Sequence, residues 1–385
     1  MHEAVIIDAV RTPLGRRNGS LSDWHPADLA AETLKALTER NSLDPVLVDD
    51  VIMGCVSQVG EQTYNIGRNA VLGAGWPDSV PGVTIDRQCG SSQQSVHFAA
   101  QGVMAGAYDV VVAAGVESMT RVPMGSSMTG GKPFGEKMRE RYQDGLIPQG
   151  LSAEMIAEKW SIPREELDGY GYDSQMRALK ATEEGRFENE IVPIDVKVDG
   201  VVGSLTTDGG IRPETTPEKL ASLRPAFKED GVVTAGNSSQ ITDGSAAILI
   251  MSRVKADELG LKPRARFVSF SLAGTDPVSM LTGPIPATEK ALAKAGLSHD
   301  DIDLYEVNEA FAAVIGAWLR ETGVSWDTVN VNGGAIALGH PLGASGARLM
   351  TTLLNELERS GSRYGLQTMC EGGGLANGTI IESLA

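Results

Sequence analysis

The chain has 385 residues, of which 42% are hydrophobic and 22% charged, a composition typical of a soluble globular protein long enough for two or three domains. Its formal net charge of −17 argues against a broad contact with nucleic acid or with an anionic membrane. The three cysteines, at positions 55, 89 and 370, are too far apart to predict a metal site or a disulfide framework.

The N-terminus enters a predicted strand almost at once. Residues 4–10 are mostly apolar, and they lack the basic segment and apolar core of a signal peptide. No apolar run in the chain reaches the roughly 18 residues of a membrane span. We therefore expect a cytoplasmic protein without a membrane partner.

Strands and helices alternate in the N-terminal part. A helical stretch passes through Ala36–Leu37 and leads to a strand at 51–54, and a short strand follows at Val83–Ile85. Apolar residues then recur at helical spacing over 96–107, and residues 110–114 are apolar on both faces. Such doubly apolar strands predict an α/β fold with helices on both sides of the sheet.

Residues 119–241 differ from the rest of the chain. They contain Met, Gly and Pro turns and two amphipathic segments, 153–160 and 164–184, that predict helices. Long insertions into compact domains are commonly functional, so we interpret this segment as an inserted loop domain over the site. The alternative is a surface excursion without a function, which the two helical patterns disfavour.

The C-terminal part repeats the N-terminal order of elements. The predicted elements are a helix over 291–297, strands at 304–308 and 329–332, a helix from Ser345 and a strand at 364–370. Corresponding elements lie about 250 residues apart throughout, which indicates a duplicated domain. Two similar α/β halves are therefore predicted.

Cys89 stands where a predicted strand meets a predicted helix. The unpaired N–H groups at a helix start favour an anion, and they can lower the pKa of a thiol from its usual value of about 8.5. Gly90, Ser91 and Ser92 leave room for a substrate to approach the sulfur. The residue is either an activated nucleophile or a buried packing residue, and its position alone does not decide between them.

Three residues of the second half complete a candidate site. His340 lies between Gly339 and Pro341, in a glycine-dense loop before a helix. Cys370 and Asn308 each end a predicted strand, and a neutral amide at such a place can hold a water or an oxyanion. If the halves are related by a pseudo-two-fold axis, these strand ends converge at one edge, which predicts a Cys/His pair with a second Cys.

These blocks, with a match that runs from Arg11-Thr12-Pro13 to the C-terminus, resemble the thiolase family. The resemblance implies two pseudo-two-fold-related βαβαβαββ halves in a layered α-β-α-β-α core, assembled as a homodimer or homotetramer. It assigns residues 1–118 and 242–262 to the N-terminal half and 263–385 to the C-terminal half. Residues 119–241 would be the loop domain, which covers the site and binds coenzyme A.

The resemblance also implies an acyltransferase that cleaves a 3-oxoacyl-CoA with coenzyme A into acetyl-CoA and a shortened acyl-CoA. Cys89 would be the acylated nucleophile, His340 its base and Cys370 an acid and base. Asn308 would hold a water in one oxyanion hole, and the backbone N–H groups of Cys89 and Gly372 would form another. Coenzyme A is then a substrate, and neither a metal nor a permanently bound cofactor is expected.

Two residues are candidates for contacts with coenzyme A. Ser239, within 236–240, matches a pantetheine contact of the family, and Arg224 matches a residue near the nucleotide or is a solvated surface charge. The stretch 148–154 lacks the His-Met pair of biosynthetic members, and 236–240 looks like the degradative class. Both features favour β-oxidation of fatty acids or steroids.

Some positions depart from the usual family pattern. Gln149, Ser92 and residues 375–377 leave the acyl preference open, and Gln149 is compatible with a polar or ring-bearing acyl group. The alternatives are a biosynthetic acetoacetyl-CoA thiolase and a non-catalytic acyl-CoA-binding relative. A decarboxylating ketoacyl synthase is disfavoured, because it uses histidines where Asn308 and Cys370 stand.

Overall fold

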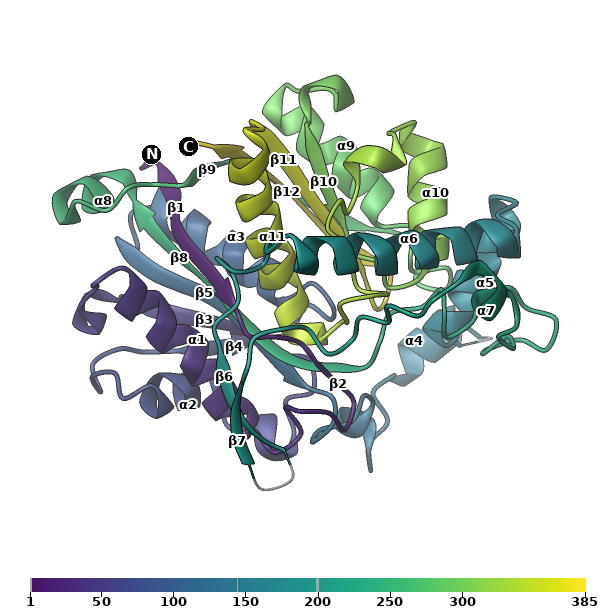
Figure 1. The fold of residues 1–385 in the computed structure, drawn as a ribbon, viewed down its shortest axis with the longest axis horizontal. Helices are drawn as coiled ribbons and strands as arrows, with labels where there is room; N and C mark the ends of the chain where they lie inside the picture. Colours follow the sequence, from purple (N-terminus) through teal and green to yellow (C-terminus); the bar gives the residue numbers. More distant parts are fainter. Residues whose placement is uncertain (1, 144, 199–200) are drawn as a thin grey trace.

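A computed structural model describes residues 2–143, 145–198 and 201–385. Over these residues one mixed sheet has the strand order β10-β11-β12-β9-β1-β8-β5-β3-β4, and β2 pairs with β8 at its side (Figure 1). Its strands are β1 (Ala4–Arg11), β2 (Gly15–Arg16), β3 (Asp50–Gly54), β4 (Val83–Ile85), β5 (Val110–Ser118), β8 (Thr242–Ser252), β9 (Ala265–Gly274), β10 (Leu304–Val307), β11 (Tyr364–Glu371) and β12 (Leu375–Ser383). A separate hairpin joins β6 (Ile194–Val198) and β7 (Val201–Leu205).

The helices fall between and around these strands. They are α1 (Pro26–Arg40), α2 (Ile66–Gly73), α3 (Ser91–Met104), α4 (Glu136–Arg141), α5 (Gln149–Lys159), α6 (Arg164–Glu183), α7 (Pro217–Ala221), α8 (Arg253–Leu259), α9 (Pro284–Ala295), α10 (Ala312–Thr322) and α11 (Ser345–Ser360). Short 3-10 helices are η1 (Pro45–Leu47), η2 (Gly60–Gln62), η3 (Ser126–Met128), η4 (His299–Asp301), η5 (Trp326–Thr328) and η6 (Leu342–Ala344). No helix in the described ranges is both long and apolar enough to cross a membrane.

The two halves of the sheet repeat one another. In the N-terminal half, β4, β3 and β5 run parallel, and β8 and β1 follow in antiparallel pairing. In the C-terminal half, β10 and β11 run parallel, and β12 and β9 follow in the same way. The halves join where Val5 and Ile6 of β1 pair with Arg266 and Ala265 of β9. The predicted duplication of an α/β unit is confirmed.

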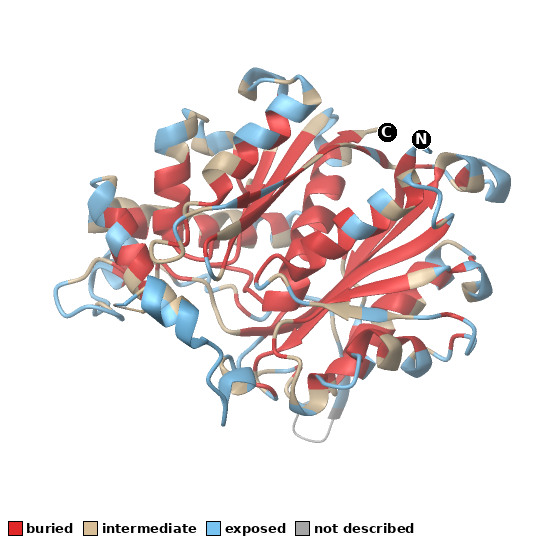
Figure 2. Ribbon diagram, turned by 180° about the vertical axis from the view of Figure 1, so that it is seen from behind, coloured by how far each residue is buried: buried red, intermediate tan, exposed pale blue. Residues whose placement is uncertain are grey.

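Five layers stack through the molecule. The central layer is the pair α3 and α11, which pack on each other. Helix α3 contacts strands of the N-terminal half, and α11 contacts strands of both halves. Helices α1 and α2 pack on the outer side of the N-terminal half, and α9 packs on the outer side of the C-terminal half (Figure 1). The central helices and the strands on either side are buried almost throughout, as Figure 2 shows.

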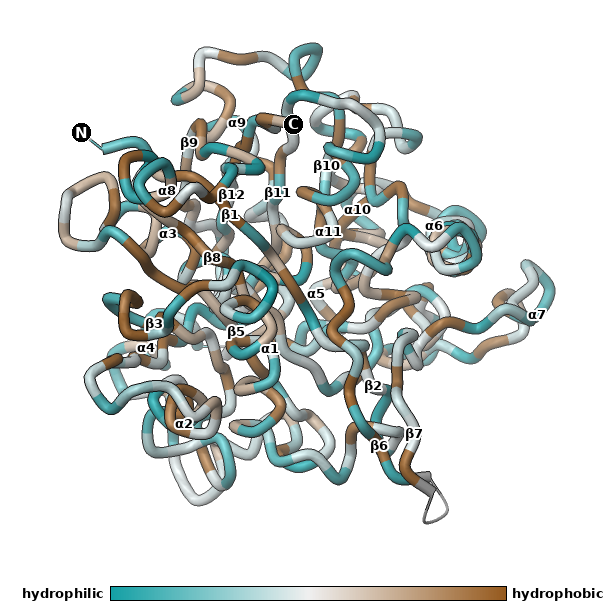
Figure 3. The backbone as a smooth tube through the Cα atoms, turned by 60° about the vertical axis from the view of Figure 1, so that its left-hand side comes forward, coloured by the Kyte–Doolittle hydropathy of each residue, from teal (hydrophilic) through white to brown (hydrophobic). Residues whose placement is uncertain are grey.

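Alternating apolar side chains explain why strands lie between two helix layers. In β5, Val110 and Val112 belong to the cluster that includes α1, whereas Val111 and Ala113 belong to the cluster that includes α3 and α11. Successive strand residues point to opposite faces, so a run without polar residues requires a cover on both sides. Figure 3 shows that β8 is largely hydrophobic in colour, whereas α6, outside the sheet, is mainly hydrophilic. The expectation drawn from residues 110–114 is confirmed.

Glycines allow the beginnings of the two central helices to come very close. A Cβ on Gly54 would overlap the backbone nitrogen of Ser92, and a Cβ on Gly115 would overlap the carbonyl oxygen of Gly343. Ser92 lies in the first turn of α3 and Gly343 lies in η6, which leads into α11, so a side chain at either glycine would push these helix starts away. The Oγ of Ser92 accepts a hydrogen bond of 2.9 Å from the backbone N–H of Ala347 in α11.

The expectations for the intervening segment hold only in part. The predicted helices at 153–160 and 164–184 correspond to α5 and α6, although α5 begins four residues earlier. The hairpin β6–β7 was not expected. The bounds 119–241 of a loop domain stay a prediction.

The predicted strand at 329–332 is wrong. Only Val329 forms a bridge, to Tyr305, and the chain then turns because Asn330 has a φ of +47°. The side chain of Asn330 holds this turn, since its Oδ1 accepts from Val307 N–H at 2.9 Å and its Nδ2 donates to the Val307 carbonyl at 2.8 Å. The side chain of Asn330 therefore supplies the hydrogen bonds to the backbone of β10 that a further strand would otherwise make.

A buried ion cluster fastens residues 190 and 208 to β1. Arg11 Nε lies 2.6 Å from Glu190 Oε1, and the guanidinium donates to both oxygens of Asp208, at 2.6 and 2.9 Å. Asp208 also accepts from the backbone N–H of Leu14 at 2.8 Å. Arg11 is fully buried, so the two carboxylates depend on its charge for their neutralisation.

Arg11→Met tests this dependence. We expect the free energy of unfolding to fall by about 3–5 kcal/mol, because two buried carboxylates lose their cation. Urea denaturation followed by circular dichroism measures the change. Lys35→Met, which breaks the exposed pair of Lys35 with Glu32, is the control and should cost less than about 1 kcal/mol. Equal losses in the two variants would contradict a special role for the buried cluster.

Candidate active site

Cys89 lies in a tight turn between β4 and α3, as its sequence position predicts. Gln88 has a φ of +49°, and Ser91 Oγ closes the turn by accepting from Arg87 N–H at 2.9 Å and donating to the Gln88 carbonyl at 2.7 Å. Cys89 is only 5% exposed and packs in a small apolar cluster. The other buried members of that cluster are Met119, Leu342, Leu349 and Met369.

The thiol of Cys89 is not acidified in this structure. Burial and, to a smaller extent, the nearby carboxyl of Glu371 raise its pKa to about 12. Hydrogen bonds from the backbone N–H groups of Gly372 and of Cys89 itself oppose this rise. The expectation that the helix start lowers the thiol pKa is therefore wrong here, because the loss of solvation outweighs the N–H groups. Cys89 carries its proton at neutral pH and requires a base.

His340 is buried and neutral, and its surroundings fix its tautomer. Its Nδ1 lies 2.6 Å from Ser345 Oγ, and that hydroxyl donates to the Pro341 carbonyl at 2.9 Å. The hydroxyl has one proton, so His340 must donate from Nδ1, which leaves a lone pair on Nε2. Burial and, to a smaller extent, the charge of Arg348 lower the pKa of His340 to about 3. Nε2 is therefore a free acceptor for a proton.

Asn308 directly follows β10 and contacts His340. Its Nδ2 lies 3.4 Å from His340 Nε2, which suits an amide N–H facing the free lone pair. The side chain is fully buried, and its Oδ1 accepts no hydrogen bond from the residues that the structure describes. A buried acceptor without a donor marks a position for a water or a ligand group. The contact with His340 agrees with the place expected for Asn308.

Cys370 lies near the end of β11, and Gly372 directly follows this strand. The pKa of Cys370 is raised well above its usual range by burial, and a charge on Cys89 raises it further, so the two sulfurs are close neighbours. Gly373 and Gly374 have φ values of +82° and +79° and form the turn into β12. This turn leaves the Gly372 N–H directed at the sulfur of Cys89. The structure thus brings Cys89, Cys370 and Gly372 together.

The two residues expected to contact coenzyme A lie in different surroundings. Ser239 is half-buried, and its backbone N–H donates to the Ala310 carbonyl at 3.0 Å, two residues beyond Asn308. Arg224 is exposed and does not line the neighbouring pocket. Sequence reasoning missed Arg212 and Lys219, whose cationic side chains do line it.

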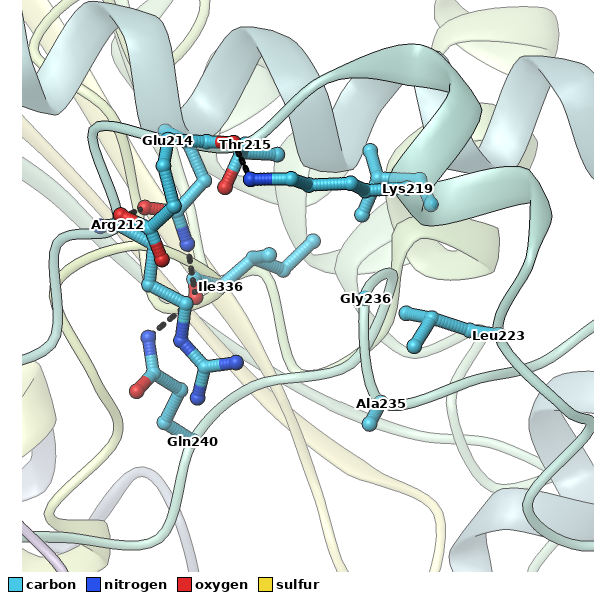
Figure 4. Close-up of a pocket in the computed structure, with 11 residues that line it drawn as sticks. Arg212, Glu214, Thr215, Lys219, Leu223, Ala235, Gly236, Gln240 and Ile336 are labelled. Carbon is cyan, nitrogen blue, oxygen red and sulfur yellow. Dashed lines mark hydrogen bonds between the residues drawn. The ribbon is translucent and has the colours of Figure 1, made fainter.

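That pocket opens between the segment 212–223 and Gly236 (Figure 4). It encloses about 140 Å³. Its lining residues are Gln175, Arg212, Glu214, Thr215, Lys219, Leu220, Leu223, Ala235, Gly236, Gln240 and Ile336. The mixture of two cations with apolar side chains suits a molecule that carries both an anionic group and a slender apolar chain. No group of acidic, His and Cys side chains in the described ranges is arranged to hold a metal ion.

Two glutamine side chains stand at Gly372. A Cβ at Gly372 would lie 3.1 Å from Gln88 Oε1 and 3.6 Å from Gln149 Nε2, so both amides border this end of the site. Gln149 begins α5, and it places a polar group of the intervening segment beside the catalytic residues. Gln88 was not singled out from the sequence, although it directly precedes Cys89. The residue pattern around Gln88 does not predict its left-handed backbone conformation.

Comparisons with known proteins found family models and relatives that cover nearly the whole chain. Family models described as thiolase, N-terminal domain, and thiolase, C-terminal domain, match residues 4–254 and 261–383. A steroid 3-ketoacyl-CoA thiolase, FadA6 of Mycobacterium tuberculosis, is 52% identical over 100% of this chain and 95% of its own length. A 3-ketoacyl-CoA thiolase of Aliivibrio fischeri is 46% identical over 99% of this chain and 100% of its own.

A solved structure is similar over the whole chain. The crystal structure of the Bacillus anthracis acetyl-CoA acetyltransferase aligns with a TM-score of 0.92 and 42% sequence identity, covering 100% of this chain and 99% of that one. Two matching family models, relatives that are 46–52% identical over nearly the full length and a shared fold show the family, and the roles of Cys89, Cys370, Asn308 and His340 stay predictions. The chain belongs to the thiolase family and is an acyltransferase.

Proposed function

We propose that the protein cleaves a 3-oxoacyl-CoA with coenzyme A, which gives acetyl-CoA and an acyl-CoA shortened by two carbons. The observation that carries the proposal is a pair of neighbouring protonated thiols, Cys89 and Cys370, of which Cys370 lies on the strand that also holds the neutral His340–Asn308 pair, since the Asn308 N–H donates to the Thr368 carbonyl of β11 at 3.1 Å. Relatives named 3-ketoacyl-CoA thiolase support the degradative direction. Biosynthesis of acetoacetyl-CoA is the reverse chemistry of the same site.

In the first half-reaction, the sulfur of Cys89 bonds to the 3-oxo carbon while its proton passes to Nε2 of His340. The bond between the second and third carbons then breaks, and its electrons remain on the acetyl-CoA fragment. Cys370 donates its proton to that carbon and becomes a thiolate. The raised pKa of Cys370 suits this role, because it keeps the thiol protonated until a stronger base is formed.

In the second half-reaction, the Cys370 thiolate takes the proton of coenzyme A. The coenzyme A sulfur bonds to the acyl carbon, and the bond from that carbon to Cys89 breaks. Cys89 leaves with its electron pair and recovers its proton from His340. The N–H groups of Cys89 and Gly372 would stabilise the tetrahedral oxyanions, and a water held by Asn308 would serve the enolate oxygen.

The pocket beside Gly236 is the candidate groove for coenzyme A. Arg212 and Lys219 offer cations for its phosphates, and Ser239 lies between this pocket and Asn308. Arg224, exposed nearby, would contact the nucleotide only at the outer rim. Coenzyme A acts here as a substrate, and no permanently bound cofactor is proposed. A homodimer or homotetramer and a cytoplasmic location stay predictions.

For the acyl group we propose a ring-bearing chain with a polar substituent. Gln149 brings an amide nitrogen to within 3.6 Å of the Cβ position of Gly372, beside the carbon that Cys89 would attack. An amide there can hydrogen-bond a carbonyl, hydroxyl or carboxylate on the acyl group. The relative named as a steroid 3-ketoacyl-CoA thiolase supports a bulky ring.

Variants of the two thiols separate the steps of the reaction. Cys89→Ala should abolish thiolysis, whereas Cys370→Ala should still accept an acyl group from a simple acyl-CoA but lose carbon–carbon cleavage by about 10²–10⁴-fold. Intact mass spectrometry reports the acyl-enzyme, and release of acetyl-CoA reports cleavage. Cys55→Ala, which changes the third cysteine, is the control and should keep both steps. Parent-like cleavage by Cys89→Ala would disprove the proposed nucleophile.

Ser345→Ala tests the tautomer of His340. Loss of the Nδ1 partner frees the ring to protonate Nε2 instead, so we expect kcat to fall by about 10–100-fold while KM changes little. Steady-state thiolysis measures both constants. Ser360→Ala, at the far end of α11, is the control. A larger change in KM than in kcat would indicate that Ser345 serves binding instead.

A panel of 3-oxoacyl-CoAs, from acetoacetyl to long-chain and ring-bearing compounds with and without a polar substituent, tests the acyl preference. We expect Gln149→Met to reduce kcat/KM for polar ring-bearing compounds by about tenfold and to spare straight chains. Gln101→Met, on the exposed side of α3, is the matched control. An unchanged order of substrates in Gln149→Met would exclude Gln149 as the selecting residue.

A further inference from the structure

Glu371 is a buried carboxyl that the proposed reaction does not use. It is the last residue of β11, lies between Cys370 and Gly372, and has no exposed surface. Its carboxyl packs against the turn that holds Cys89, since a Cβ on Gly90 would overlap Oε1 of Glu371. Among the described residues, no side chain donates a hydrogen bond to either carboxyl oxygen and no cation forms an ion pair with it, and only the backbone N–H of Asn377 acts on it as a donor.

Asn377 of β12 faces the same spot with a second unpaired acceptor. Its Oδ1 would lie 3.1 Å from a Cβ on Gly90, and no described residue donates to it. The nitrogen side of the amide is turned toward α3, where Nδ2 lies 3.2 Å from Gln94 Oε1 and 3.2 Å from His97 Nδ1. In this orientation both contacts hold the amide nitrogen on the side of α3. Its oxygen is therefore left on the side of Glu371.

Glu371 and the Asn377 oxygen lack a hydrogen-bond donor between them, and a proton on Glu371 would supply it. A carboxylate and an amide oxygen can only accept hydrogen bonds, whereas a carboxylic acid donates one. An ionised carboxylate with no cation paired to it and no donor beyond one backbone N–H is expensive to bury, so the group holds its proton. Protonation of Glu371 supplies the one donor that Asn377 lacks. The same step removes a negative charge from beside Cys89.

The charged neighbours of Glu371 agree with a neutral acid. Burial raises the pKa of Glu371 well above its usual range, and the charge of Asp86 raises it further. The charge of Arg87 and the backbone N–H of Asn377 act in the opposite direction but do not reverse the shift. The titratable groups on the adjoining elements, Cys89 and His97, are uncharged at neutral pH, because burial raises the pKa of the former and lowers that of the latter.

We propose that Glu371 is a carboxylic acid that stays neutral, donates a hydrogen bond to Asn377 and positions the Cys89 turn in its reactive form. Glu371 touches no reacting atom and is a positioning residue. Its ionisation would place a negative charge beside the sulfur, which would disfavour the Cys89 thiolate and any oxyanion at the Gly372 N–H. The inference rests on the proposed function only in taking Cys89 as the reactive thiol.

Glu371→Gln is the decisive variant, because an amide donates the same hydrogen bond and has no charge at any pH. We expect it to keep kcat within about threefold of the parent, with the substrate that the parent cleaves best. Glu371→Leu leaves Asn377 Oδ1 without a donor and should lose at least about tenfold in kcat. Asn377→Leu removes the acceptor instead and should lose a similar factor. Parent-like turnover in both leucine variants would overturn the positioning role.

Infrared difference spectroscopy observes the proton directly, whether or not a variant turns over substrate. The parent minus the Glu371→Gln spectrum at neutral pH should contain the carbonyl stretch of a protonated carboxylic acid. A difference spectrum that shows the bands of an ionised carboxylate instead would disprove the proposal. This readout does not depend on Cys89, so its outcome is independent of the proposed reaction.

The pH profile of Cys89 alkylation gives a second readout that packing alone would not change. Iodoacetamide labelling of the Cys89 peptide should follow the same profile in parent and Glu371→Gln through neutral pH. At alkaline pH the parent should fall below the variant, because ionised Glu371 raises the thiol pKa of the parent only. A profile that is already shifted to lower pH in Glu371→Gln at neutral pH would show that Glu371 is charged in the parent. Failure of Cys89→Ala to lose turnover would refute the proposed function instead.

Discussion

The two central helices begin in direct contact, and this contact determines where the reactive groups meet. Cys89 directly precedes α3 and His340 lies just before α11, so the distance between the helix starts sets the approach of thiol and imidazole. Glu117 reinforces it, because its carboxylate accepts backbone N–H groups of residues 56 and 57 near α3 and of Gly343 near α11, at 2.9–3.0 Å. The site is therefore a consequence of how the duplicated halves pack on each other.

Burial gives this centre an uncharged resting state. The pKa of each thiol, Cys89 and Cys370, is raised, and that of His340 is lowered, so protons reside on the sulfurs and none on Nε2. Charge appears only when a substrate carbonyl is present to receive electrons from sulfur. Backbone N–H groups and amides then stabilise it without reorganisation of fixed ions. The proposed neutral Glu371 is one more buried group of this centre that carries no charge at rest.

Local patterns in the sequence predicted the elements that carry the site, but not the contacts among them. The strand Val83–Ile85 and the helix after Cys89 follow from side-chain periodicity, which is a local property. The pKa of Cys89 was predicted with the wrong sign, because the depth of burial depends on residues far along the chain. The strand expected at 329–332 failed because Asn330 satisfies β10 with its side chain. Ser345 gave no signal, since only the folded turn brings its hydroxyl to His340.

The close packing at the start of the central helices limits which positions around the site tolerate substitution. At Gly54 and Gly115 even a methyl group would collide with the opposite half, so the centre cannot acquire new substrate contacts from these strands. Gln149 comes from α5, outside the packed layers, and borders the same centre. New acyl specificities can therefore arise there without disturbing the chemistry, and a directed-evolution library is best placed at the start of α5.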